Sequence, residues 1–427
     1  MRHMVVFACV LLLITTSAVR AQTSSSATAP ELVQKLMERI EQLEKRVAEL
    51  ESNSPKAVLA APGPESTPAT QPPLSPQAAH QAHLQAGAGA EPQPQASPSL
   101  RLAGFTDFNF SATDQRGSKS GFSEGQFVLH ASSALSPRVN VFSELSFTAR
   151  TDAGTGMPSV TGFNPEVERI LIRFDQSDYF KVSFGRYHTP VNWWNTAFHH
   201  GQWLQTTVSR PEMVRFGGPF IPVHFVGGLI EGTLPAGGLH VNYNLGIGNG
   251  RGSVISRGGD AGDVNNNRAW LLNLFARPDR PFGLQFGGSA YRDKITLPNG
   301  REFQEWISSG HIVWLKENPE VIAEFANVHH SEPARSGTFN SQAYYVQLAY
   351  RLPCCQQLWK PYYRFEYIHI PRTEPVFGLS VPGLVGSTVG IRYDITSFAA
   401  IKLEYRNQRR PGQPRVNGGF VQTAFTF

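Results

Sequence analysis

The sequence of 427 residues is poor in charge and has no long hydrophobic run. Charged residues make up 17% and apolar residues 41%, against about 25% and about 45–50% in typical soluble domains. This combination argues against an ordinary cytoplasmic enzyme and against intrinsic disorder along most of the chain. No stretch reaches the roughly 18 consecutive apolar residues of a membrane-spanning helix, which excludes a polytopic helical membrane protein.

The signatures of common catalytic and binding sites are also missing. There is no Walker A, Rossmann or zinc spacing, and the dispersed positive charge predicts no nucleic-acid partner. Gly121–Gly125 matches the pattern G-x-S-x-G, but it opens an alternating strand instead of the strand-to-helix turn that a nucleophile elbow requires. His188, His199 and His200 could bind a metal, but their spacing fits no familiar site. The sequence therefore predicts no enzyme, no cofactor and no metal.

Residues 1–21 are predicted to be a secretory signal peptide. Arg2 and His3 form a basic start, Met4–Ile14 is an apolar run of 11 residues, and Val19–Ala21 is a candidate cleavage site. Eleven residues are too few to cross a bilayer core of about 30 Å as a helix. We therefore expect an exported protein.

Residues 22–51 are predicted to form a periplasmic coiled-coil helix, and residues 52–99 a linker rich in Pro, Ala and Gln. The heptad places apolar residues at its a and d positions, namely Val33, Leu36, Ile40, Leu43, Val47 and Leu50. Because fewer than three heptads are present, an isolated helix of this length is marginal. A single amphipathic helix that lies on another surface is the alternative.

From residue 100 to residue 427, segments of roughly ten residues alternate apolar and polar positions. In Ala399–Arg406, for example, Ile401 and Leu403 share one face while Lys402 and Glu404 share the other. The pattern predicts sixteen strands, near 101–112, 122–135, 139–150, 166–175, 179–188, 223–234, 239–248, 267–277, 283–293, 303–315, 320–330, 341–352, 361–370, 384–395, 398–409 and 415–427.

The connections between these strands are alternately long and short. The long ones include 151–165, 189–222, 249–266 and 371–383, and most of the others are only a few residues long. An even number of strands with this alternation is typical of outer-membrane barrels, which must close because unpaired strand edges cannot face lipid. We therefore expect an all-β, sixteen-stranded antiparallel transmembrane barrel. The last strand ends at Phe427, which resembles the signal read by the barrel-assembly machinery.

Several short motifs resemble bacterial porins, most of all the phosphate-selective (O/P-type) porin family. They are Phe184–Pro190, Tyr243–Gly250, Ala343–Tyr350, Gly390–Tyr393 and Lys402–Tyr405. The resemblance implies trimers of sixteen-stranded barrels, some of which carry an N-terminal periplasmic coiled coil. Phosphate specificity is not carried over, because the basic residues of that family cannot be matched one by one in this sequence.

A porin works through a water-filled lumen with a narrow constriction, and in general porins the loop after the fifth strand folds into the lumen. Here that loop is residues 189–222. We expect aromatic side chains to pack it against the wall and Arg210 and Arg215 to face the pore. The constriction residues are predicted to be Trp193, Trp194, His199, His200, Arg210 and Arg215, and the alternative is an extracellular cap.

Alternation also predicts which charged side chains face the lumen, and many of them are expected to pair across the wall. They include Arg173, Arg351, Arg364, Arg392, Lys402, Arg406, Glu366 and Glu404. From residue 101 on, 31 Lys and Arg face 25 Asp and Glu, an excess of +6 that mildly favours anions.

The sequence therefore predicts an outer-membrane porin, a homo-trimer in the lipid bilayer, that passes small hydrophilic or anionic solutes by diffusion. The helix is expected to lie in the periplasm, where it either joins subunits or reaches the cell wall. The rivals are a surface barrel with a closed lumen that binds a partner, and an outer-membrane hydrolase. The adjacent Cys354 and Cys355 are either a vicinal disulfide or two free thiols.

Overall fold

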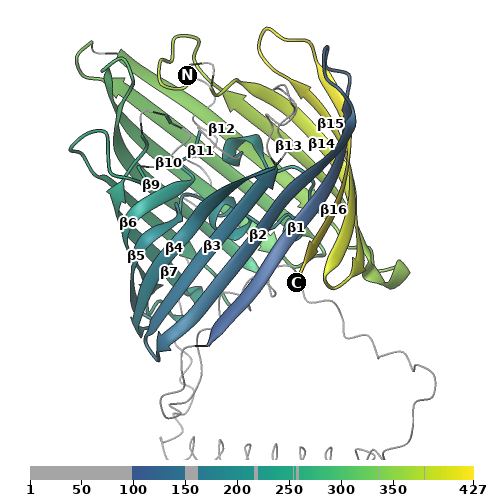
Figure 1. The fold of residues 1–427 in the computed structure, drawn as a ribbon, viewed down its shortest axis with the longest axis horizontal. Helices are drawn as coiled ribbons and strands as arrows, with labels where there is room; N and C mark the ends of the chain where they lie inside the picture. The colour runs from purple at the N-terminus through teal and green to yellow at the C-terminus, as the bar shows by residue number, and fades with distance from the viewer. Residues whose placement is uncertain are drawn as a thin grey trace, which may run out of the picture. The chain divides into compact units, whose positions relative to one another are not determined.

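The computed structural model describes residues 99–149, 162–215, 220–252, 254–255, 259–335, 337–378 and 380–427. In this part of the chain, sixteen antiparallel strands form one closed barrel (Figure 1). The first eight strands are β1 (Leu100–Thr113), β2 (Gly121–Ser136), β3 (Val139–Ala149), β4 (Phe163–Ser177), β5 (Phe180–His188), β6 (His224–Thr233), β7 (Val241–Asn249) and β8 (Ala269–Ala276).

The second eight strands are β9 (Leu284–Thr296), β10 (Glu302–Leu315), β11 (Glu320–Glu332), β12 (Gly337–Ala349), β13 (Trp359–His369), β14 (Leu384–Thr396), β15 (Ala399–Arg409) and β16 (Val416–Thr426). These bounds confirm the predicted antiparallel barrel, strand by strand. The predicted signal peptide 1–21, coiled coil 22–51 and linker 52–99 lie outside the described residues, apart from residue 99.

The barrel closes where β1 pairs with β16, as Figure 1 shows. Beyond the end of β16, the N–H of Gly104 donates to the carbonyl oxygen of Phe427 at 2.9 Å, and the N–H of Phe427 donates to that of Gly104 at 3.1 Å. The Phe427 ring stacks on Phe127 of β2 with 5.8 Å between the ring centroids. The terminal phenylalanine therefore lies at the seam that closes the ring.

The distribution of polar and apolar side chains is inverted with respect to a water-soluble barrel. In β15 the large apolar side chains of Leu403 and Tyr405 are both 49% exposed, whereas Lys402 and Glu404, at alternating positions, are buried. In β12 the polar Ser341 and Gln347 are buried, and Leu348 is exposed. Successive side chains of a strand point to opposite faces, so the wall is apolar outside and polar inside.

In the described part of the chain, the helices are short and lie in the connections. They are α4 (Trp194–Ala197), η1 (Glu212–Val214), η2 (Gly237–Leu239) and η3 (Cys355–Gln357). Among these residues, no helix combines the length and the apolar character needed to span a membrane. Cys354 and Cys355 are exposed, free thiols in the turn between β12 and β13, which answers the question that the sequence left open.

Candidate functional site

The loop between β5 and β6, residues 189–222, crosses the interior of the barrel. Its residue Trp193 contacts Glu324 of β11, and its residue His200 contacts Glu168 of β4. β4 and β11 lie seven strands apart in the closed ring. One segment can reach both of these walls only from inside the barrel.

The loop first attaches to β9, β11 and β12. The Glu324 carboxylate accepts hydrogen bonds from the N–H groups of Trp193 and Trp194, both at 2.7 Å. These N–H groups lie at the start of α4, where the helix itself offers no acceptor. The buried Trp194 ring meets Tyr345 of β12 edge-on, with 5.9 Å between the centroids. Hydrogen bonds and ring packing together hold this part of the loop on the wall.

Arg364, Arg392 and Lys402 form the second attachment, on β13, β14 and β15. Arg364 donates to the carbonyl oxygen of Ser209 at 2.8 Å and to the hydroxyl of Thr207 at 3.1 Å. Arg392 donates to the carbonyl oxygens of Trp203 at 2.6 Å and of Gln205 at 3.0 Å, and Lys402 donates to that of Thr207 at 3.1 Å. These cations satisfy carbonyl groups of an irregular segment that has no secondary-structure partners.

Glu404 of β15 completes this attachment as an acceptor. It receives hydrogen bonds from the N–H of Val208 at 2.9 Å and from the hydroxyl of Ser209 at 2.7 Å. On β13, Glu366 accepts the N–H of Glu212 at 2.6 Å. The basic side chains of this wall therefore bind carbonyl oxygens of the loop, and the acidic side chains bind its N–H groups.

The inward charges that the sequence singled out also pair with one another. Arg364 lies 2.8 Å from Glu366, Arg406 lies 2.6 Å from Glu404, and Arg173 lies 2.7 Å from Asp175. A buried ion is tolerated only when it is paired and hydrogen-bonded. Asp394 accepts both Arg351 and Arg392, at 2.6 and 2.7 Å.

Arg210 and Arg215 occupy different surroundings within the loop. Arg210 donates to the carbonyl oxygen of His199 at 2.6 Å, and desolvation lowers the pKa of its guanidinium to about 9 although Glu168 and Asp107 favour the charged form. Arg215 is partly exposed and pairs with Glu212 at 3.0 Å. Of the two, Arg210 is the one enclosed by the loop and the wall.

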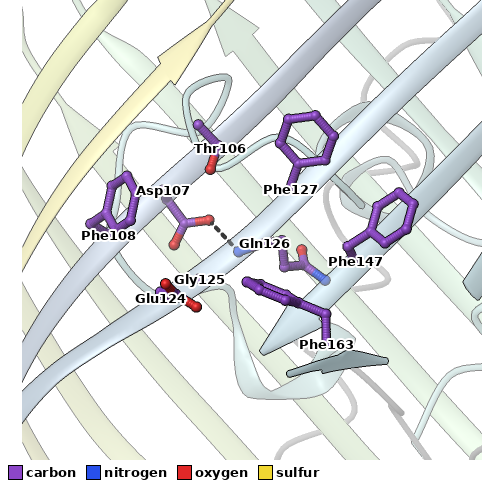
Figure 2. Close-up of a pocket in the computed structure, with 9 residues that line it drawn as sticks. All are labelled: Thr106, Asp107, Phe108, Glu124, Gly125, Gln126, Phe127, Phe147 and Phe163. Atoms are coloured by element: carbon purple, nitrogen blue, oxygen red, sulfur yellow. Dashed lines mark hydrogen bonds between the residues drawn. The ribbon is translucent and has the colours of Figure 1, made fainter. Parts of the chain in front are cut away.

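A β-bulge in β1 and β2 positions Gln126 beneath the loop. Asp107 of β1 accepts the N–H of Gln126 at 3.0 Å, the dashed line in Figure 2. A Cβ at Gly125 would lie 1.9 Å from an oxygen of Asp107, so only glycine allows this close approach. A pocket of about 340 Å³ lies at the bulge, and Figure 2 shows residues that line it. The exposed rings of Phe108 and Phe127 line it, and it therefore belongs to the outer face.

A cluster of four histidines and one carboxylate lies where the loop meets β4, β5 and β6. One ligand atom from each of its residues lies within 4.8 Å of all the others, and the residues are Glu168, His188, His199, His200 and His224. Burial and the neighbouring imidazoles of His200 and His224 hold the pKa of His199 well below its usual value.

Sequence reasoning named three of these histidines but missed the other two residues. Glu168 of β4 and His224 of β6 lie 56 positions apart, and only the path of the loop brings His199 and His200 to both. The alternation of residues along β4 could have placed Glu168 on the inner face, but no neighbouring residue in the sequence indicates that it meets histidines.

The two sides of the lumen differ in exposure. Every second residue of β11, from Glu320 to Glu332, is buried, and so is every second residue of β13 from Lys360 to Ile368. Near β1, β3, β4 and β15, inward polar side chains keep partial exposure, among them Asn109, Thr148, Arg169 and Arg406. The loop therefore covers one wall and leaves polar groups accessible on the other.

The barrel is similar to solved structures of bacterial outer-membrane proteins. An anion-selective porin from Comamonas acidovorans matches with a TM-score of 0.55 and 12% identity, covering 78% of this chain and 100% of that one. The trimer form of OmpT from Vibrio cholerae matches with 0.52 and 11%, covering 78% and 100%. The outer membrane channel DcaP of Acinetobacter baumannii matches with 0.52 and 10%, covering 79% and 100%.

No protein-family model matches the sequence, and no curated protein is significantly similar to it. The likeness to solved structures, at 10–12% identity, concerns the fold. The chain thus has the sixteen-stranded barrel fold of bacterial outer-membrane porins.

Proposed function

We propose that the protein is an outer-membrane porin through which small hydrophilic solutes diffuse passively, with loop 189–222 as the constriction. The observation that carries the proposal is that this loop crosses the interior and is attached to the wall on both sides. A constriction keeps a fixed width only if its loop is attached to the wall, because an irregular segment whose peptide groups bind water would change shape.

The outer surface of the barrel supports a position in the bilayer. Large apolar side chains such as Leu348, Leu403 and Tyr405 are exposed, while charged ones such as Lys402 are buried. Lipid accepts the first, and the polar interior of the barrel accepts the second. Closure of the ring leaves no strand edge unpaired in the hydrocarbon.

We assign the passage for solutes to the part of the lumen near β1, β3, β4 and β15 that the loop leaves accessible. Arg169 and Arg406 keep partial exposure there, beside the neutral Asn109 and Thr148. Together with the excess of +6 from residue 101 on, these groups favour a mild preference for anions, phosphate included. The fold neighbour from Comamonas acidovorans is described as anion-selective, but the preference proposed here rests on this chain's own charges.

Current recordings in planar bilayers test this function. The purified full chain, once inserted, is expected to give discrete current steps in potassium chloride. The rival, a surface barrel with a closed lumen that binds a partner, is favoured by the complete burial of the inner side of β11 and β13. Insertion without current steps would support that rival and contradict the porin.

We further propose that the exported protein forms a trimer, assembled by the barrel-assembly machinery through its terminal strand and Phe427. Its residues 22–51 would form a periplasmic coiled coil that either joins the subunits or reaches the cell wall, as in some O/P-type porins. Removal of residues 22–99 separates these roles. A trimer that survives the removal assigns the helix to the cell wall, and a trimer that dissociates assigns it to assembly.

A further inference from the structure

The histidine cluster has the composition of a transition-metal site. It offers up to four imidazoles and one carboxylate, with the ligand atoms within 4.8 Å of one another. Imidazole nitrogens suit Zn²⁺, Cu²⁺ and Ni²⁺, whereas Mg²⁺ and Ca²⁺ prefer oxygen ligands only. The residues come from β4, β5, β6 and the loop, so an ion bound here would join the loop to the barrel wall.

Glu168 presents one oxygen to the imidazoles. Its Oε1 accepts the hydroxyl of Ser146 at 2.7 Å. Its Oε2 lies 3.1 Å from Nε2 of His200 and 4.0 Å from Nε2 of His199. Ser146 therefore fixes one carboxylate oxygen of Glu168, and the other oxygen faces the histidines.

The hydrogen bond of His200 to Gln126 prepares its other nitrogen for a metal. The Gln126 amide nitrogen donates to Thr148 at 2.9 Å, so its oxygen, 3.3 Å from Nδ1 of His200, acts as the acceptor. In the neutral ring Nδ1 then carries the proton, which leaves Nε2, 3.1 Å from Oε2 of Glu168, as the nitrogen that can bind a metal. Metal-binding histidines are typically oriented by such a bond from their other nitrogen. A cation between Nε2 and Oε2 would bond to both atoms.

His224 has the opposite arrangement. Its Nδ1 lies 3.0 Å from a guanidinium nitrogen of Arg186, which can only donate. The proton of a neutral His224 is therefore on Nε2, which lies 2.8 Å from Oε2 of Glu168. His224 orients the carboxylate and is not a ligand.

The charges around the cluster are mixed. Arg186 is paired with Glu166 and Asp260, and Arg169 is paired with Glu144. Glu144 also lies 3.5 Å from Nε2 of His188. Arg210, a third guanidinium near the cluster, donates to the carbonyl oxygen of His199 at 2.6 Å. Three guanidiniums therefore stand against the carboxylates of Glu144, Glu166, Glu168 and Asp260, and a dication would meet a net charge of about −1.

We propose that Glu168, His188, His199 and His200 bind one divalent transition metal of the zinc class and that the bound ion fastens loop 189–222 to β4 and β5. Three nitrogens and one oxygen complete the fourfold coordination that Zn²⁺ adopts in proteins. This site goes beyond the porin function, and its test does not depend on conductance.

The test is titration of the purified full chain with Zn²⁺ in competition with a chromophoric chelator. One Zn²⁺ per chain is expected to bind. Replacing both loop histidines, His199→Gln with His200→Gln, is expected to abolish this binding. The variant Gln126→Ala, which removes only the orienting bond of His200, is expected to weaken it by about 10–100-fold. The matched control is His369→Gln, since His369 is exposed at the end of β13.

Two further measurements make the outcome decisive. Electrophoretic mobility with and without boiling shows that each variant still forms a closed barrel. X-ray absorption of the zinc-loaded protein is expected to show a shell of nitrogen and oxygen at about 2.0–2.1 Å that contains imidazole. No binding by the folded wild type, or equal binding by the wild type and the double variant, would overturn the site. Failure of either kind would leave the porin proposal untouched, just as a barrel without conductance could still bind zinc.

Discussion

Loop 189–222 meets two parts of the wall through different chemistry. On β13, β14 and β15, cations such as Arg364 and Arg392 and the carboxylate of Glu404 bind the main chain of the loop. On β4, β5 and β6, a carboxylate and imidazoles meet the imidazoles of His199 and His200. Guanidinium groups keep their charge near neutral pH, whereas imidazoles can bind transition-metal ions. The comparison teaches that one side is a permanent anchor and the other can respond to its surroundings.

The largest effect is expected when the loop segment that makes both of these contacts is removed. Deletion of residues 200–209 takes away the partners of both walls and opens the lumen. Single-channel conductance should rise several-fold, because resistance concentrates at the narrowest point of a pore. An unchanged conductance in a correctly inserted barrel would show that the loop is not the constriction.

The permanent anchor can be broken at Arg364. The substitution Arg364→Met leaves Glu366 buried without its partner and removes donors from Thr207 and Ser209. Breaking a buried pair from one side costs about 3–5 kcal/mol, to be measured by denaturant unfolding. The control is Arg335→Met: Arg335 is exposed and Glu332 keeps Arg301 as its partner, so the loss should be no more than about 1 kcal/mol. Equal losses for the two variants would contradict the anchor.

A milder loss of stability is expected from a substitution at Glu324, which binds the start of α4. Glu324→Gln keeps an acceptor for the N–H groups of Trp193 and Trp194 but removes its charge. Hydrogen bonds to charged groups contribute about 1.5–3 kcal/mol and neutral ones about 1 kcal/mol, so a loss of about 1–2 kcal/mol is expected. Faster chymotrypsin cleavage within the loop would report it. Glu302→Gln, at an exposed position, is the control that should cleave at the wild-type rate.

Acid should weaken the turn between β10 and β11, where Glu317 pairs with Lys360 of β13. Burial raises the pKa of Glu317, but Lys360 and Arg351 outweigh burial and lower it to about 2. Because the folded value lies below the ordinary 4.5, the stabilisation is present above pH 4.5 and is lost as pH falls toward 2. Unfolding midpoints across this range should fall less in Glu317→Gln than in the wild type. Parallel curves would contradict the assignment.

The smallest effect concerns the side of the lumen that the loop leaves accessible. In a salt gradient, the reversal potential should indicate a mild preference for anions. Arg406→Gln should shift it slightly toward cations, because Arg406 is partly exposed there. A cation-selective wild type would contradict the proposed selectivity.

The barrel was predictable because its pattern is local. In β15, Leu403 and Tyr405 alternate with Lys402 and Glu404 within a few residues, and lipid outside with water inside dictates that order. The course of loop 189–222 is not local. The binding of Arg364 to Ser209 joins positions 155 residues apart, and the meeting of Glu168 with His200 depends on where the loop turns. Spacing in the sequence therefore indicated neither the anchor's partners nor the complete histidine cluster.

The most direct test of the account is whether the loop lies against β15 inside the barrel. The cysteine pair Ser209→Cys and Glu404→Cys, with Cys354 and Cys355 replaced by serine, joins groups that lie 2.7 Å apart. A short bifunctional thiol reagent should cross-link this pair in the folded protein, giving a mobility shift after boiling. The pair Ser209→Cys and Asn273→Cys, which places the second thiol on β8, should stay unlinked. Cross-linking of the β8 pair, or none of the β15 pair while both thiols react singly, would contradict the position of the loop.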